Sequence, residues 1–310
     1  MSEAAQFFLE AKSHPEALYE AGMCYLHGLG LTMDQQKAME KFRAAADCSN
    51  PHLQSSLLYG KHLLEKECFE TALEYLGKSQ QAEGWYTIGM TSKYDLNTRC
   101  DCLKKASLLK HNNARFEYGQ LLLRRTFFGN DELIENLPED ILSEHQHDST
   151  QGYNLIYEAA VNGHVPSMLL LGDINTELYA TSPEPRSKKE EARKWYKEAA
   201  IRNSGLACLR LAETLIDENA ISKKETILNY LTQAADKEIL EASKLLIKYY
   251  IDNASDWLKS HEVSKLCDLM KYAERVLEGD GGNKTSATDK SIGIYCEAFC
   301  FFTWYLKFCL

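Results

Sequence analysis

Several features that would point to particular functions are scarce in this sequence of 310 residues. Lysine and arginine (35 together) are outnumbered by aspartate and glutamate (45), which gives a net charge of −10. This balance argues against sequence-independent binding of nucleic acid, because such binding relies on basic side chains that neutralise phosphates. Only 6 prolines and 17 glycines are present, and the hydrophobic content of 45% is ordinary, so global disorder is not expected.

Motifs of the main enzyme classes are also missing. The sequence has no Gly-x-Ser-x-Gly turn, no His-Glu-x-x-His zinc motif, no P-loop and no dinucleotide fingerprint. The stretch Gly28-Leu29-Gly30 is interpreted as a turn. His145 and His147, followed by Asp148, have no further ligand cluster at usable spacing, so we interpret them as part of a solvated loop. We therefore expect a protein that is not an enzyme and has no cofactor and no metal.

The ten cysteines lack the arrangement of a redox pair. No Cys-x-x-Cys is present, and the first residues are acidic and polar rather than apolar, which argues against a secretory signal. We therefore expect reduced thiols, buried as small hydrophobic side chains, in a cytoplasmic protein. A mitochondrial location or the cytosol of a host cell stays open, as does a redox or metal role for the thiols. The cysteines are Cys24, Cys48, Cys68, Cys100, Cys102, Cys208, Cys267, Cys296, Cys300 and Cys309.

The sequence does contain a pattern that recurs along the chain. A small residue, Ala17, is followed four and five residues later by Ala21 and Gly22. Copies of this first pattern begin at Ser55, Gly84, Ala114, Ser167, Ala207 and, in degenerate form, Ala242. A second pattern combines an alanine, large apolar residues and a pair of small residues, as in residues 38 to 46. In four cases the first pattern begins seven residues after the small pair ends, a regularity that chance does not readily produce.

These spacings predict pairs of antiparallel helices. The recurring residues lie on one face of a helix, where small side chains let two helices approach and large ones fill the space beside them. A glycine inside a helix costs about 1 kcal/mol relative to alanine, so its recurrence indicates a packing requirement. Each pair buries its apolar face only against its neighbours. We therefore expect an all-α solenoid of about seven helix pairs.

The segment from 17 to 47 resembles a repeat of the Sel-like repeat family, which is related to the tetratricopeptide repeats. The resemblance covers roughly residues 15 to 275 and implies a right-handed α/α solenoid, a non-catalytic scaffold or adaptor that binds partner proteins. A mitochondrial, cysteine-rich member of the family supports the alternative of a cysteine-dependent redox or cofactor-binding assembly factor. The matching residues are Ala17, Ala21, Gly22, Tyr25, Gly28, Gly30, Asp34, Ala38, Phe42, Ala45 and Ala46.

The expected solenoid spans residues 1–278 and is followed by two further segments. Within the solenoid, residues 126–150 contain seven acidic and no basic residues, and we interpret them as a surface insertion, with an acidic docking element as the alternative. Residues 279–291 are interpreted as a linker. The apolar segment 292–310 is interpreted as a helix that caps the array. Membrane anchoring of a peripheral adaptor and a partner or oligomer interface are the alternatives for this last segment.

The partner-binding surface is predicted from helix geometry. Counted from the first small residue of each repeat, positions 0, 4, 5 and 8 point into the helix pair, whereas positions 3 and 6 lie on the opposite side. We expect positions 3 and 6 to face the concave side of the array and to bind a protein or peptide. Leu58 and Leu170 are the expected anchors, although packing between repeats is the alternative for both. The predicted row is Glu20, Met23, Leu58, Lys61, Thr87, Met90, Glu117, Gln120, Leu170, Asp173, Arg210 and Glu213.

Overall fold

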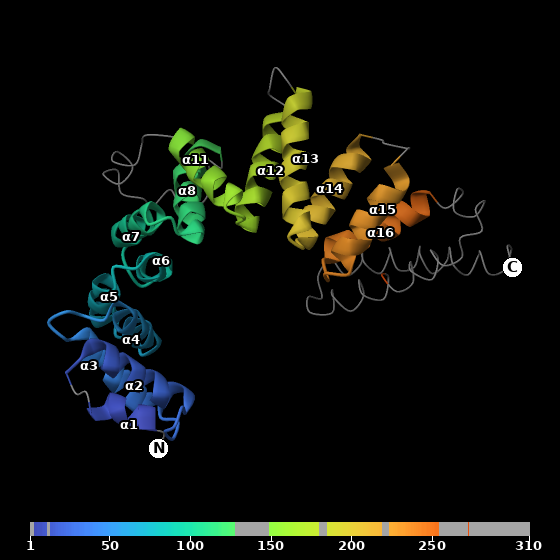
Figure 1. Cartoon of the computed structure of the whole chain (residues 1–310). Coiled ribbons are helices and arrows are strands. Elements are labelled where there is room, and N and C mark those ends of the chain that lie inside the picture. Colours follow the sequence, from blue (N-terminus) through green and yellow to red (C-terminus); the bar gives the residue numbers. More distant parts are fainter. Residues whose placement is uncertain are drawn as a thin grey trace, which may run out of the picture. The chain divides into compact units, whose positions relative to one another are not determined.

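The structure, a computed structural model, describes residues 3–10, 13–127, 149–179, 185–218, 223–253 and 272. These ranges contain fourteen helices and no strand, which confirms the prediction of an all-α fold (Figure 1). The helices are α1 (Glu3–Glu10), α2 (Pro15–His27), α3 (Gln35–Ala46), α4 (Leu53–Glu65), α5 (Phe69–Lys78), α6 (Ala82–Met90), α7 (Leu96–Leu108), α8 (Asn112–Phe127), α11 (Ser149–Val161), α12 (Val165–Tyr179), α13 (Pro185–Ile201), α14 (Gly205–Asp217), α15 (Lys224–Ala235) and α16 (Leu240–Asp252).

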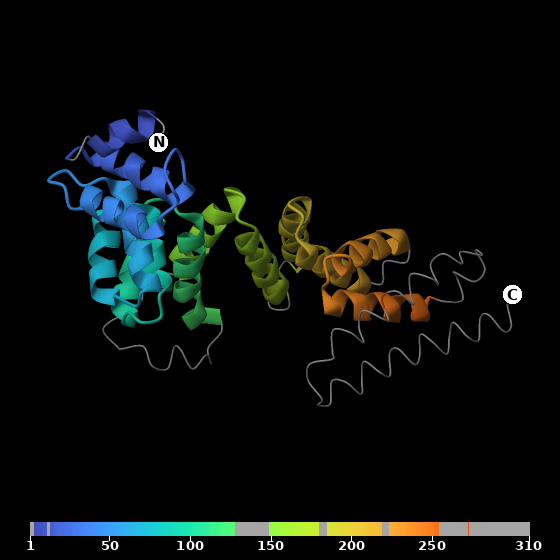
Figure 2. The same cartoon turned by 90° about the horizontal axis from the view of Figure 1, so that it is seen from below.

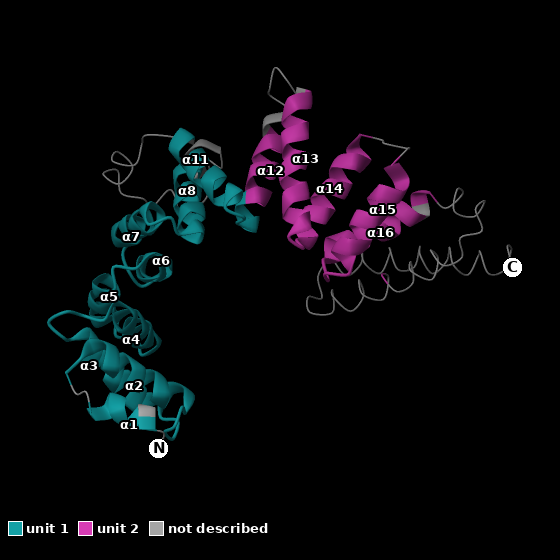
Figure 3. Cartoon of the chain, in the orientation of Figure 1, with its two compact units in different colours: residues 1–167 teal, residues 168–310 magenta. Residues whose placement is uncertain are grey.

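The chain divides into two compact units, Met1–Ser167 and Met168–Leu310 (Figure 3). In unit 1 each helix from α1 to α8 packs against the next along the chain, and α8 packs against α11. The same succession can be followed by colour in the rotated view of Figure 2. In unit 2, α13 packs against α14, α14 against α15 and α15 against α16. Each unit is therefore a stack of helices in which neighbours in sequence are neighbours in space.

Each repeat folds as a first helix and a second helix. The first helices are α2, α4, α6, α8, α12 and α14, and their second helices are α3, α5, α7, α11, α13 and α15. The degenerate copy of the pattern at Ala242 lies in α16, which takes the place of a further first helix. The described residues thus hold six helix pairs and α16, preceded by α1, a helix that the sequence analysis did not predict.

The recurring glycines stand where the two helices of a pair approach most closely. A Cβ atom on Gly89 would lie 2.6 Å from Cγ of Leu103, well inside the 3.5–4.0 Å at which carbon atoms make favourable contact. Gly172 of α12 faces the ring of Tyr196 in the same way. The spacing argument predicted this close approach, and the structure confirms it.

The core of each unit is built from equivalent positions of successive second helices. One large side chain per second helix lies against the first helix of the same pair, and each is at most 3% exposed. These side chains are Phe42, Leu76, Leu103, Ile156, Tyr196 and Leu231. The small pairs beside them, such as Ala45 and Ala46, are also buried. Burial of a large apolar side chain contributes ~1.5–3 kcal/mol, so this line of residues stabilises every repeat.

The acidic insertion is described only at its ends. Helix α8 extends to Phe127 and α11 begins at Ser149, and these two helices pack against each other. The insertion therefore connects the first and second helices of one pair. Its residues 128–148, the linker 279–291 and the apolar segment 292–310 lie outside the described residues. Among the described helices, none combines the length and the apolar character needed to cross a membrane.

Candidate interaction surface

In unit 1 the predicted row lies where successive first helices meet. Lys61 of α4 donates a hydrogen bond of 2.9 Å to one oxygen of Glu83 in α6. Nε2 of His111, just before α8, lies 3.0 Å from the other oxygen of Glu83. The hydrogen bond from Lys61, supported by His111, holds the pKa of Glu83 below its ordinary value despite partial burial. One carboxylate thus connects three successive repeats.

The histidine that completes this bridge also caps a helix. Nδ1 of His111 accepts a hydrogen bond of 3.2 Å from the backbone N–H of Ala114, in the first turn of α8. His52 accepts from Ser55 at 3.2 Å at the start of α4, and its Nε2 lies 3.1 Å from Glu16 of α2. In both histidines Nδ1 accepts a hydrogen bond, so the neutral ring carries its proton on Nε2. Nε2 in turn points at a carboxylate of the preceding repeat.

Each of these histidine rings packs against an aromatic ring of the preceding first helix. The ring centroids of Tyr19 and His52 are 4.4 Å apart, and those of Tyr86 and His111 are 4.5 Å apart. The histidines stand three residues before the first small residue of their repeats. This regularity is visible in the sequence, but it was not used to predict the contacts between repeats.

His14 and His164 occupy the same position in their repeats, and His164 packs in the same way as His52 and His111. The ring of His164 packs against Phe116 at a centroid distance of 5.2 Å, and its Nδ1 lies 2.8 Å from Oγ of Ser167. The position that holds Glu83 in the third repeat is occupied by Asn113 in the fourth. Burial, with the nearby charge of His111, lowers the pKa of His164. The neutral imidazole is therefore favoured at this junction.

In unit 2 the structure brings three members of the predicted row together. Tyr196 of α13 donates a hydrogen bond of 2.7 Å to Asp173 of α12. Arg210 of α14 lies 3.5 Å from the same carboxylate and 3.1 Å from Glu213. Burial lowers the pKa of Arg210, but the hydrogen bond to Glu213 and the charge of Asp173 outweigh this effect and raise it. The row in unit 2 therefore also carries a polar network from one first helix to the next.

The remaining members of the row are placed less specifically. Met90 is the most accessible apolar member, with 43% of its surface exposed. Leu58 and Leu170, the expected anchors, are partly buried. The hydroxyl of Thr87 donates to the backbone oxygen of Glu83 within its own helix. Four further members are partly buried, namely Glu20, Met23, Glu117 and Gln120. Partner binding by the row stays a prediction.

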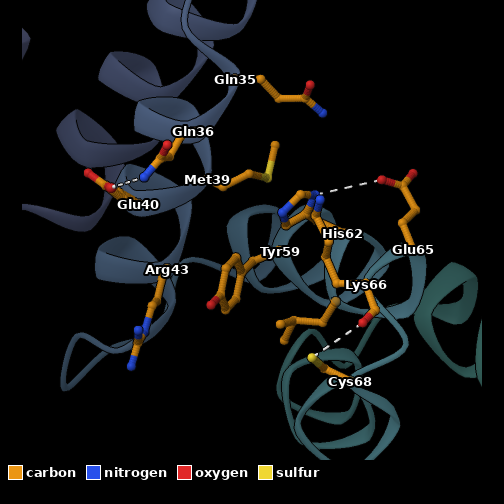
Figure 4. A pocket seen from close by; sticks show the side chains of 11 residues that line it. Gln35, Gln36, Met39, Glu40, Arg43, Tyr59, His62, Glu65, Lys66 and Cys68 are labelled. Atoms are coloured by element: carbon orange, nitrogen blue, oxygen red, sulfur yellow. Dashed lines mark hydrogen bonds and ion pairs between the residues drawn. The ribbon is translucent and has the colours of Figure 1, made fainter.

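A cavity of about 710 Å³ lies between α3 and α4 (Figure 4), and no member of the predicted row lines it. Met39, Tyr59 and Leu63 supply its apolar lining, and charged side chains flank them. Nδ1 of His62 is buried there without a hydrogen-bond partner and lies 3.6 Å from Glu65. The sequence analysis missed this cavity because it assigned the facing sides of a second helix and the next first helix to packing.

A comparison of the sequence with models of protein families identifies two of the repeats. The Sel1 repeat model matches residues 15–50 and 165–204. These matches contain the pair α2 and α3 and the pair α12 and α13. The chain therefore contains Sel1 repeats in these two segments. Proteins of this family generally act as scaffolds for interactions between proteins.

Two solved structures are similar to this protein. A protective antigen present in uropathogenic Escherichia coli strains, which displays an SLR fold, has 18% identity and a TM-score of 0.38. The similarity covers 91% of this chain and 68% of the antigen. A Sel1 repeat protein from Oxalobacter formigenes has 17% identity and a TM-score of 0.48, over 76% of this chain and 97% of that one. No curated protein sequence matches.

Most described cysteines of this protein are buried, as expected. Burial raises the pKa of Cys24, Cys100, Cys102 and Cys208, in the case of Cys102 to about 11. Because the thiolate is the reactive form, these four side chains stay protonated near neutral pH. Cys68 differs from the expectation, since it is exposed.

The described residues contain no group of three or more His, Cys, Asp or Glu side chains that could hold a metal ion. The stretch from His145 to Asp148 and the last four cysteines lie outside those residues. The last four are Cys267, Cys296, Cys300 and Cys309.

Proposed function

We propose that this protein is a non-catalytic scaffold that binds a partner protein through the predicted row. The observation that supports this function most strongly is that a row residue makes a polar contact to a neighbouring repeat in each unit. Lys61 is bonded to Glu83 in unit 1, and Asp173 contacts Arg210 in unit 2. These contacts order the side chains before a partner arrives, which reduces the entropy that binding costs.

The row also provides accessible surface on the first helices, and Asp173 within it accepts a hydrogen bond from Tyr196 of its own second helix. Its members are partly buried or exposed, and they combine apolar side chains such as Met90 with charged ones such as Lys61. A stable protein interface covers about 800 Å² on each partner, which a row repeated over several helices supplies without a deep pocket. This composition resembles a polar interface with a few apolar contacts.

The alternative functions receive less support from the described residues. A cysteine-dependent redox or assembly factor requires accessible thiolates, whereas burial keeps the thiols of Cys100, Cys102 and Cys208 protonated. A peripheral adaptor anchored through residues 292–310 depends on a segment outside the described residues. A cytoplasmic location is part of the proposal, and it is supported by the six described cysteines, which are all free.

Site-specific photo-crosslinking in cells tests the proposed function. A photoreactive phenylalanine is introduced at Met90 in the row or, as a control, at Leu108 at the end of a second helix of the same unit. Both side chains are exposed, Met90 to 43% and Leu108 to 74%. We expect a partner to be crosslinked from position 90 and not from position 108. Crosslinks to the same partner from position 108 alone would contradict the proposal.

A further inference from the structure

The first helices carry a face on which acidic side chains dominate. We call the residues one position before and three, six and ten positions after the first small residue of each repeat the first-helix face. In unit 1 the acidic members of this face are Glu16, Glu20, Glu65, Glu83 and Glu117, and the basic members are Lys61 and Arg124. In unit 2 the acidic members are Asp173, Glu177, Glu213, Asp217, Glu241 and Asp252. The basic members in unit 2 are Arg210 and Lys248.

Three of the second helices, α3, α7 and α13, show the opposite balance. Helix α7 carries three basic residues and one acidic residue, and α13 carries six basic residues and three acidic ones. A negative first-helix face therefore follows from where the charges lie and not only from the net charge of the chain. A face of one sign raises the local concentration of partners with the opposite sign.

The internal ion pairs neutralise only part of this negative charge. Lys61 is already bonded to Glu83, and it is one of the two basic residues of the face in unit 1. In unit 2, Arg210 contacts both Asp173 and Glu213. Two acidic side chains share one arginine there, so the surplus of acidic side chains persists in each unit.

The apolar members of the face fit the same kind of partner. Met23, Leu58 and Met90 lie among the acidic residues on successive first helices. The aliphatic stems of lysine and arginine pack on such side chains while their charged ends reach nearby carboxylates. A surface of this composition therefore suits a basic polypeptide better than a free cation.

We propose that the first-helix face binds a segment of a partner protein that is rich in lysine and arginine. This inference rests on the proposed function, because it names the chemistry of the partner for the same surface. The negative face supplies attraction and the apolar residues supply contact area. The basic second helices α3, α7 and α13 repel the same segment, which favours its binding to the first helices.

Selection of peptides on the full chain tests the proposal first. A displayed library of short random peptides is selected against the protein at low salt, and the bound sequences are determined. We expect enrichment of lysine and arginine and depletion of aspartate and glutamate. Enrichment of acidic or uncharged sequences overturns the proposal.

A matched pair of variants then locates the binding surface. One selected peptide is labelled, and its affinity is measured by fluorescence anisotropy. The face variant is Glu20→Gln, Glu117→Gln and Asp217→Asn. The control variant is Glu70→Gln, Glu190→Gln and Asp101→Asn on second helices, which changes the net charge of the chain by the same amount. All three control side chains are exposed.

We expect the face variant to weaken binding about fivefold or more, since each exposed ion pair contributes a factor of about 1.5 to 5. The control variant should stay within about twofold of the wild type. Raising the salt from about 0.05 M to about 0.5 M shortens the screening length roughly threefold, and it should weaken binding to the unchanged protein. Equal affinities of the two variants, or binding that does not depend on salt, overturn the proposal.

Two further outcomes separate this inference from the proposed function. If selected peptides lack basic residues but lose affinity on Met90→Glu, the basic partner is wrong while the scaffold function stands. If no peptide responds to any substitution on the first helices, both fail. Self-association of the chain, detected by sedimentation velocity and lost in the face variant, would replace the foreign partner by a second copy and overturn the proposal.

Discussion

Gly172 of α12 faces the ring of Tyr196 in α13 so closely that no side-chain carbon fits between them. The same relationship recurs between Gly89 and Leu103 in unit 1. In both pairs the second helix contributes a buried large side chain, and the glycine supplies the space for it. The distance between the two helices of a pair is therefore set by one small residue of the first helix.

Gly172→Ala should destabilise the protein because the added methyl group overlaps the ring of Tyr196. Overpacking of this kind costs ~1–3 kcal/mol, which exceeds the ~1 kcal/mol that alanine gains over glycine in a helix. Gly77→Ala is the matched control, since a Cβ there would meet Trp85 at an ordinary 3.6 Å. Urea unfolding should show a lower free energy of unfolding for Gly172→Ala than for the wild type. Gly77→Ala should show no such decrease. An unchanged midpoint for Gly172→Ala would contradict this account of the helix pair.

Glu83→Gln should weaken the contacts between the second, third and fourth repeats at neutral pH. The side chain of Glu83 is 45% exposed, so solvent screening limits the expected loss to ~1 kcal/mol or less. Its pKa is lowered in the folded state by the hydrogen bond from Lys61. The wild type is therefore more stable than Glu83→Gln by the whole of this difference at pH values above the ordinary glutamate pKa of about 4.3. The difference in the free energy of unfolding is lost as the pH falls through the lowered pKa of Glu83.

Urea unfolding of the wild type and Glu83→Gln across this pH range checks the prediction. Glu70→Gln, an exposed glutamate of α5, is the control. A difference between Glu83→Gln and the wild type that grows on acidification would have the wrong sign for the bridge described here.

His164 should make the stability of the protein decrease on mild acidification. Its pKa is lowered from 6.5 by burial and by His111, so the folded state favours the neutral ring. The stability that this ring contributes is full above about pH 6.5 and is lost as the pH falls through the lowered value. His164→Asn retains a capping side chain and should reduce this pH dependence.

The control for this prediction is His14→Asn, because His14 makes no side-chain cap bond to α2. Unfolding free energies are measured near pH 7.5 and near pH 5.5. If His164→Asn and His14→Asn show the same pH dependence, the neutral imidazole of His164 has no role in the junction.

The cysteines should react with an alkylating reagent according to their burial. Cys68 is exposed and should be modified rapidly in the folded protein near neutral pH. Cys102 should be modified only after unfolding, because burial shields it and raises its pKa to about 11. Mass spectrometry after brief labelling identifies the modified sites. Rapid labelling of native Cys102 would favour the redox alternative.

The sequence predicted contacts within a repeat better than contacts between repeats. Spacing along one helix defines which side faces the second helix, so the positions of Gly89 and Gly172 followed from it. The bridge from Lys61 through Glu83 to His111 joins three repeats, and a helical period carries no information about which side chains of different repeats meet. Only the histidines that stand three residues before the first small residue in four of the repeats signalled these junctions.

The cavity between α3 and α4 escaped the sequence analysis for a related reason. The size of the cavity depends on the angle between two successive helix pairs. This angle is determined by how the side chains of the two pairs pack against each other. The insertion expected at residues 126–150 stays a prediction, because residues 128–148 lie outside the described residues. It rests on the interruption of the repeat pattern in this stretch.

The central claim is that the first helices bind the partner, and a comparison of two double variants tests it most directly. Leu58→Glu with Leu170→Glu places one charge on the row in each unit. Leu108→Glu with Ile201→Glu places the same charges on exposed ends of second helices in the same two units. Circular dichroism melting first establishes that both variants are folded.

The affinity of each double variant for the crosslinked partner is then measured by isothermal titration calorimetry. We expect the row variant to bind at least about tenfold more weakly than the wild type, as for the loss of apolar anchors in an interface, and the control variant to bind normally. Wild-type affinity in a folded row variant would contradict the account and move the binding site away from the first helices.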